Sequence, residues 1–188
     1  LALLQGGQAE DAAAQLLETS NAAPHLVAPR LYLARALSKL ERWGQARDVL
    51  ASTSEAFSDQ AEVWTAKGDV ERTLLHHKDA EKSFRKALAL KVNNPYALNN
   101  LAVVVRAQFR FDEAVELFQE ALKHAPDHPK AHGNLGNALV EMGRTTEAER
   151  HLRKALDLNP NDQSSRCNLA IYLTREERPD EAIPYFDG

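Results

Sequence analysis

Residues 129–162 read PKAHGNLGNALVEMGRTTEAERHLRKALDLNPND, and this stretch decides the fold. Its first part places Leu135 and Leu139 four residues apart, which puts both on one face of a helix. Its second part does the same with Ala148 and Leu152. A glycine followed by an arginine separates the two parts. The stretch therefore predicts two helices joined by a tight turn.

The same pattern recurs along the chain with a period of 34 residues. An alanine marks each period, a large apolar residue follows four positions later, and a small residue stands twelve positions before the interior alanines. The six alanines are Ala12, Ala46, Ala80, Ala114, Ala148 and Ala182. The units are residues 1–26 (partial), 27–60, 61–94, 95–128, 129–162 and 163–188 (partial). Such a period predicts stacked helix pairs, because one pair cannot bury all of its apolar surface alone.

Composition agrees with helices and excludes several classes of protein. Of 188 residues, 44% are hydrophobic and only 8 are Gly and 8 Pro, a mixture that favours helix. The net charge of −4, without a basic stripe, argues against nucleic-acid binding. A single cysteine, Cys167, excludes a disulfide framework and a multi-cysteine zinc site. No stretch approaches 18 consecutive apolar residues, so we expect no membrane insertion. We expect a cytoplasmic protein, with the periplasm as the alternative.

The residues that recur every 34 positions, each set here called a column, resemble the tetratricopeptide repeat. The pattern of that repeat runs from an aromatic residue through Leu-Gly to Ala, Phe, Ala and Pro. Residues 61–94 carry this pattern as Trp64, Gly68, Ala80, Phe84 and Ala87. Residues 129–162 carry it as Leu135-Gly136, Gly143, Ala148, Ala155 and Pro160. The resemblance covers essentially the whole chain. It implies an all-α fold, a right-handed superhelical solenoid of antiparallel helix pairs over residues 1–188.

Two charged residues depart from the family pattern. Lys67 and Glu71 replace apolar residues in the first helix of residues 61–94. We expect this helix to pack loosely or to face solvent at these positions.

The resemblance also implies a concave groove lined by the first helix of each repeat. Asn100, Asn134 and Asn168 lie 34 residues apart and are expected to form a ladder along it. An asparagine amide both donates and accepts hydrogen bonds, so the ladder could hold a peptide by its main chain. Such ladders occur in the repeats of peptide O-GlcNAc transferases, which HGNLGNALVEMGRTTEA is similar to. Neighbouring groove positions that would choose the peptide sequence are Asn99, Asn137, Arg106, Lys130, Arg175 and Tyr96.

Other interpretations of the groove remain open. The NLG and NLA triplets are also common repeat consensus, with asparagine tolerated on a solvated face. A two-carboxylate clamp, as in chaperone-binding repeats, needs lysine and arginine at fixed places on the first helices. That clamp is disfavoured because the column where its lysine would start holds Leu31, Thr65, Asn99 and Gly133.

No constellation for chemistry stands out. His124, His128 and His132 are four residues apart, but Pro126 and Pro129 prevent one continuous helix there. We interpret the histidines as solvated turn residues and expect neither a metal nor a cofactor. No histidine is placed to activate the cysteine thiol, so we expect no catalytic role for it.

The sequence therefore predicts a non-catalytic module that binds a peptide or partner protein in its groove. One alternative is the substrate-recruiting arm of a larger enzyme, a glycosyltransferase or a sulfotransferase. Another is a self-assembling scaffold, in which the open end near Gly188 packs on a second copy.

Overall fold

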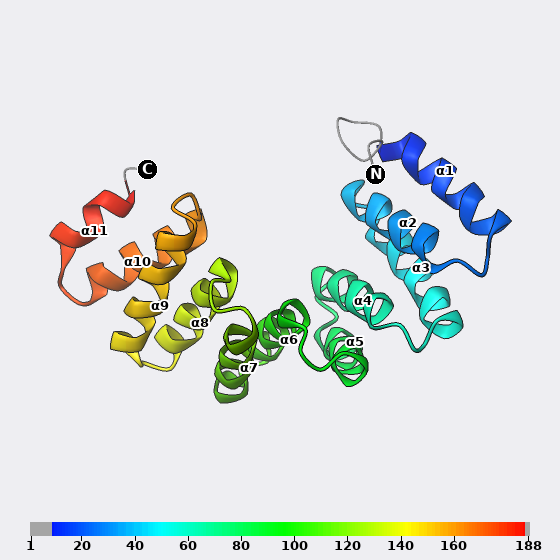
Figure 1. The fold of residues 1–188 in the computed structure, drawn as a ribbon. Helices are drawn as coiled ribbons and strands as arrows, with labels where there is room; N and C mark the ends of the chain where they lie inside the picture. The colour runs from blue at the N-terminus through cyan, green and yellow to red at the C-terminus, as the bar shows by residue number, and fades with distance from the viewer. Residues whose placement is uncertain (1–8, 187–188) are drawn as a thin grey trace. The chain divides into compact units, whose positions relative to one another are not determined.

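The structure is a computed structural model, and it describes residues 9–186 of the chain. Over these residues the regular elements are eleven α-helices, without a strand (Figure 1). The chain divides into two compact units, residues 1–92 and residues 93–188. Not one of the described helices has the length and apolar character needed to cross a membrane.

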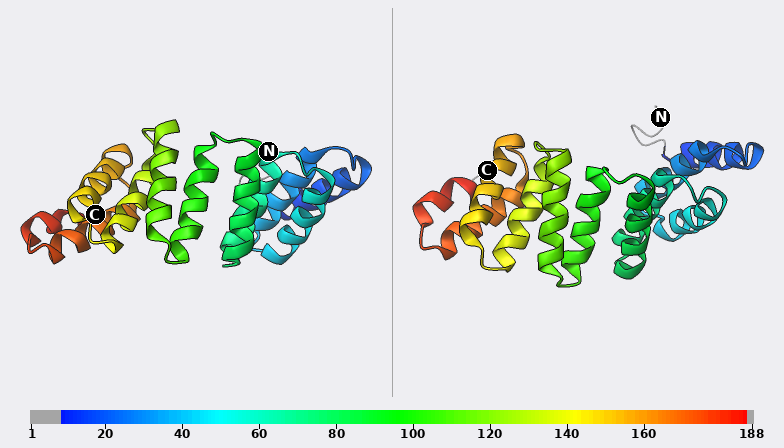
Figure 2. Two further views of the ribbon diagram at one scale, coloured as in Figure 1. Left: turned by 90° about the horizontal axis from the view of Figure 1, so that it is seen from below. Right: turned by 60° about the horizontal axis from the view of Figure 1, so that its bottom comes forward.

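In residues 9–92, the described part of the first unit, there are five helices, and each packs against the next along the chain (Figure 1). They are α1 (Ala9–Ala22), α2 (Val27–Lys39), α3 (Trp43–Ala56), α4 (Ala61–Thr73) and α5 (His77–Leu90). In residues 93–186 of the second unit there are six helices, which also pack each against the next along the chain (Figure 2). They are α6 (Pro95–Ala107), α7 (Phe111–His124), α8 (Pro129–Glu141), α9 (Thr145–Leu158), α10 (Gln163–Arg175) and α11 (Pro179–Phe186).

The helix starts coincide with the predicted repeat starts. Helices α2, α4, α6, α8 and α10 begin at the first residue of their repeat. Local chemistry fixes two of these starts. The Asn94 side chain accepts hydrogen bonds from the backbone N–H groups of Tyr96 and Ala97 in α6. The Asp162 side chain accepts one from the backbone N–H of Ser165 in α10. The prolines at the starts of α6 and α8 cost no helical hydrogen bond, because the first N–H groups have no partner within the helix.

The periodic columns form the interior of each unit. The side chains four residues after the period alanine, Leu50, Phe84, Phe118 and Leu152, are all 0% exposed. Each interior period alanine is likewise fully buried. Burial of a large apolar side chain stabilises by about 1.5–3 kcal/mol, so this column is a principal source of stability in both units. Phe186, the last member of the column, is instead 58% exposed.

The turn inside each repeat from residue 27 onward uses a left-handed backbone conformation. The residues at this position, again 34 apart, have φ between 57° and 72°. They are Glu41, Leu75, Phe109, Gly143 and Glu177. Only glycine adopts this conformation without steric cost, so four of the five turns carry backbone strain. The side chains of Leu75 and Phe109 are 72% and 81% exposed.

The prediction of loose packing at Glu71 is wrong. This side chain is 5% exposed, and its Oε2 accepts a hydrogen bond of 2.6 Å from the Ser83 hydroxyl on α5. Burial raises the pKa of the Glu71 carboxyl above its usual value, although the hydrogen bond from Ser83 acts in the opposite direction. Lys67 lies 5.0 Å from the centre of the Trp64 ring and donates to the Ser54 hydroxyl. Partners on α3, on α5 and on α4 itself therefore take the place of the expected loose or solvent-facing arrangement.

Two predictions are not settled by the fold. One continuous solenoid over all six repeats stays a prediction, since the chain divides into two compact units. The open end near Gly188 lies outside the described residues.

Candidate functional site

Three asparagines of the second unit are joined by hydrogen bonds. The Asn134 amide on α8 donates to Oδ1 of Asn99 on α6, at 3.1 Å. The Asn99 amide in turn donates to Oδ1 of Asn100, at 3.0 Å. Asn99 and Asn100 are buried, while Asn134 is half-buried. The amides thus connect α6 to α8, through Asn99 and not directly through its neighbour Asn100.

A pocket of about 180 Å³ lies between the first turn of α10 and α8. Its lining from α8 includes three predicted groove residues, Lys130, Asn134 and Asn137. Its other residues are Gly133, Asp162, Ser164 and Ser165. Asp162 accepts the backbone N–H of Ser165 at 2.9 Å, which fixes the start of α10 beside the pocket.

Sequence reasoning missed Asp162, Ser164 and Ser165 as pocket residues. The 34-residue period was a signal for one of them: Ser164 occupies the same repeat position as Lys130 and Tyr96, two predicted groove residues. The other two lie in the pocket because α10 approaches α8 closely.

Gly133 lies beside Ser165 in the pocket. A Cβ atom on Gly133 would lie 2.5 Å from the Ser165 hydroxyl oxygen, closer than a real Cβ comes to another heavy atom. A side chain at this position would therefore displace the Ser165 hydroxyl, whereas the Cβ atoms of Ser165 and Ala155, at 3.9 and 3.8 Å, lie at ordinary contact distances. Gly133 thus leaves room for the Ser165 hydroxyl in the lining of the pocket.

The remaining predicted residues differ in their surroundings. Tyr96 is 48% exposed, Arg175 is exposed, and Asn168 is half-buried. Arg106 forms an ion pair of 3.0 Å with Glu141 of α8. Among the residues that the structure describes, neither Asn137 nor Asn168 uses its side-chain amide in a hydrogen bond. These two amides have donors and acceptors available for a ligand.

A network of charges holds the last helices of the second unit together. Glu149 of α9 accepts from Arg178 at 2.7 and 3.2 Å and from Arg153 at 2.8 Å. Both arginines also contact Glu181 of α11. The hydrogen bonds from Arg178 and Arg153 lower the pKa of the Glu149 carboxyl. This network braces α9 against α11.

The interpretation of all histidines as solvated turn residues is wrong for His132. It lies in α8, is 8% exposed, and its ring stacks on His151 of α9 with ring centres 5.2 Å apart. The 34-residue period indicated that His132 lies within a helix, because it shares its repeat position with the apolar residues Trp64 and Leu98. Among the described residues, no group of three or more His, Cys, Asp or Glu side chains could hold a metal ion. The Cys167 thiol is exposed.

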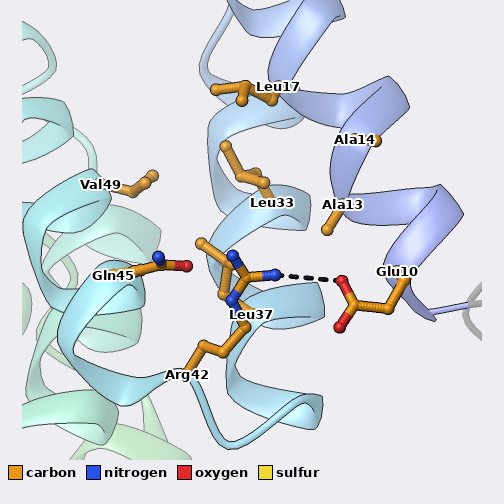
Figure 3. Close-up of a pocket in the computed structure, with 9 residues that line it drawn as sticks. All are labelled: Glu10, Ala13, Ala14, Leu17, Leu33, Leu37, Arg42, Gln45 and Val49. Atoms are coloured by element: carbon orange, nitrogen blue, oxygen red, sulfur yellow. Dashed lines mark hydrogen bonds and ion pairs between the residues drawn. The ribbon is translucent and has the colours of Figure 1, made fainter.

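The first unit has a more apolar hollow of about 390 Å³ between α1, α2 and α3 (Figure 3). Its apolar lining consists of Ala13, Ala14, Leu17, Leu33, Leu37 and Val49. At one end the Arg42 guanidinium faces Glu10, and the two form an ion pair of 3.0 Å (Figure 3). The hollow contains none of the predicted groove residues.

Two models of known protein families match this chain. A sequence model described as tetratricopeptide repeat matches residues 3–70 and 105–166. A second model with the same description matches residues 65–129. No curated protein matches the chain.

Solved structures share the fold. One, reported as the functional characterisation of Pseudomonas aeruginosa PilF, is 27% identical with a TM-score of 0.79, over 86% of this chain and 73% of that chain. The APC/C hetero-tetramer Cut9–Hcn1 is 20% identical with a TM-score of 0.84, over 95% of this chain and 36% of that chain. YrrB, described as a TPR protein with an unusual peptide-binding site, is 19% identical with a TM-score of 0.70, over 92% and 89%. The chain belongs to the tetratricopeptide repeat family, whose members are in general non-catalytic scaffolds for protein–protein interaction.

Proposed function

We propose that residues 93–188 bind an extended segment of a partner protein, chiefly through hydrogen bonds to its main chain. The observation that carries the proposal is the pocket between α8 and α10. It gathers Lys130, Asn134 and Asn137 into one polar hollow, and the Asn137 amide there has no partner among the described residues. An amide that can donate and accept suits a peptide group, which also does both.

The side chains around the pocket support selectivity for particular peptides. Lys130 and Asp162 place opposite charges on its lining, and Ser164 adds a hydroxyl. Tyr96 of α6, in the same repeat position as Lys130, exposes an aromatic ring that can cover an apolar side chain of the partner. Hydrogen bonds to the main chain of the partner would supply affinity, and these side chains would discriminate among peptide sequences.

The test begins with peptides selected by the 188-residue protein from a random display library. Fluorescence anisotropy then compares the wild type with the groove variant Lys130→Ala/Asn137→Ala/Asn168→Ala. Asn99 and Asn100 are left intact, because they are buried and bonded to each other. The control variant, Gln119→Ala/Asp157→Ala, changes two exposed side chains on the second helices α7 and α9.

We expect the groove variant to bind at least about tenfold more weakly, the equivalent of one or two lost hydrogen bonds. The control variant should bind like the wild type. A peptide with N-methylated main-chain amides should also lose affinity, because it cannot donate to asparagine oxygens. Equal binding by all three proteins, or unchanged binding of the methylated peptide, would refute main-chain recognition in this pocket.

Two narrower functions stay predictions. One is the resemblance of residues 129–162 to repeats of peptide O-GlcNAc transferases, and with it the role of recruiting arm for a larger enzyme. The other is self-assembly. A mass that rises with protein concentration in light scattering would support self-assembly, and a constant monomer mass would refute it.

A further inference from the structure

Two histidines from different helices share one hydrogen bond inside the second unit. Nδ1 of His132 on α8 lies 2.9 Å from Nδ1 of His151 on α9, and the two rings are inclined by 27°. His132 is buried and His151 half-buried. The second ring nitrogen of His132, Nε2, lies 2.9 Å from the backbone oxygen of Pro126.

These contacts fix where the protons sit when both rings are neutral. The Pro126 oxygen only accepts, so His132 must carry its proton on Nε2. Nδ1 of His132 is then an acceptor, and the proton between the rings belongs to Nδ1 of His151. Nε2 of His151 is left without a proton, 3.5 Å from a guanidinium nitrogen of Arg150. The neutral pair therefore has a single consistent arrangement of protons.

Full protonation is incompatible with this arrangement. If both rings were charged, each Nδ1 would carry a hydrogen pointing at the other, and at 2.9 Å these hydrogens would be roughly 1 Å apart. Two like charges would also face each other in a poorly solvated site. A first proton can be placed on Nε2 of His151, but it meets the positive charge of Arg150. A second proton requires the rings to separate.

The surrounding charges do not reverse the preference of the two histidines for the neutral form. Around His132 these are Lys154, Asp127 and His128, and Lys154 is already paired with Asp127 at 3.3 Å. Around His151 they are Arg150 and Glu147, and Glu147 is held by Arg144 at 2.8 Å. Burial is the main cause that lowers the pKa of both histidines, and His132 and Arg150 assist it for His151, whose pKa falls to about 4.

We propose that the His132–His151 pair is a proton-sensitive latch, which joins α8 to α9 at neutral pH and releases the α8–α9 hairpin when it takes up protons in acid. The latch lies where α8 packs on the second helix of its own repeat. Its action concerns the stability of this hairpin and does not depend on the proposed peptide binding.

The sign of the pH dependence follows from the difference between folded and unfolded states. An unfolded histidine binds a proton near pH 6.5, whereas the folded pair resists it, so the stabilising effect is complete above pH 6.5. It is lost progressively as the pH falls from about 6.5 to about 4. For His151 alone, the folding equilibrium constant should fall about 30-fold between pH 7.5 and pH 5.

The experiment compares the 188-residue wild type with His151→Gln and with the control His124→Gln. In the His151→Gln variant, the new side-chain amide can donate a hydrogen to Nδ1 of His132 and cannot become charged in this range. His124 lies on the outer surface of α7 with Glu120 as its partner. Urea unfolding followed by circular dichroism at pH 7.5 and pH 5 gives the stability change for each protein. NMR of the imidazole Hε1 protons gives the titration midpoint of each histidine in the wild type.

We expect wild type and His124→Gln to lose stability steeply at pH 5 and His151→Gln to lose about 30-fold less in its folding constant. In the wild type, the His132 and His151 signals should titrate below pH 6.5 and shift together with backbone signals of α8 and α9. The proposal is overturned if both rings titrate near pH 6.5, or if His151→Gln shows the wild-type pH dependence. If His151→Gln fails to fold, the wild-type NMR titration still decides.

Discussion

Replacing Gly136 by valine should separate α8 from α9 and destabilise the second unit. A Cβ atom at Gly136 would lie 2.7 Å from Cγ of Leu152 and 3.2 Å from the backbone oxygen of Ala148. Leu152 is 0% exposed, so neighbouring atoms prevent it from moving aside, and the carbonyl belongs to the backbone of α9. Valine adds two further carbons to a position that has no space for one. Overpacking of this kind costs about 3 kcal/mol, less a few tenths for the better helix propensity of valine.

The matched control is Gly44→Val in the first turn of α3. No atom lies within 4 Å of a Cβ built on Gly44, so steric cost is absent there. This variant should change the free energy of unfolding by less than about 0.5 kcal/mol. The two variants make the same chemical change in a helix and differ only in what surrounds the new side chain.

Urea unfolding followed at 222 nm measures both effects. With a slope of about 2 kcal/mol per molar urea, Gly136→Val should lower the midpoint by about 1.5 M. The two units need not unfold together, so the loss should fall on the transition that includes α8 and α9. Equal midpoints for Gly136→Val, Gly44→Val and the wild type would refute the claim that α8 and α9 touch through this glycine.

Three further substitutions test other features of the fold by the same unfolding assay. Glu71→Gln should raise stability at pH 7.5 by up to about 1 kcal/mol, because the Ser83 hydroxyl can still donate to it while the buried charge is removed; a clear loss would show that the charge itself is stabilising. Glu149→Gln should cost about 1–2 kcal/mol at pH 7.5 by weakening the bonds from Arg178. Because the folded pKa of Glu149 is lowered, this difference should shrink as the pH falls below 4.5, and a constant difference down to pH 3 would contradict it. Gly143→Ala should cost about 1 kcal/mol through backbone strain alone, since φ is 72° and no atom lies within 4 Å of the new Cβ, and an unchanged midpoint would count against strain in these turns.

The sequence by itself determined the helices and the interior columns. Leu50, Phe84, Phe118 and Leu152 are the interior members of one 34-residue column, and the structure buries all four completely, whereas Phe186 at the end of the column is 58% exposed. These features are predictable because they depend on spacing along one helix and on local signals such as Asn94 before Pro95. Three groove candidates, Lys130, Asn134 and Asn137, also meet in one pocket as their shared helix would suggest.

Only the tertiary structure decided which polar side chains meet across helices. Glu71 reaches Ser83, Asn134 reaches Asn99 instead of Asn100, and His132 reaches His151. A periodic pattern states which face a residue occupies but not the distance between two helix faces. That distance depends on the volumes of all the side chains between the helices, and a difference of about one ångström separates a hydrogen bond from no interaction.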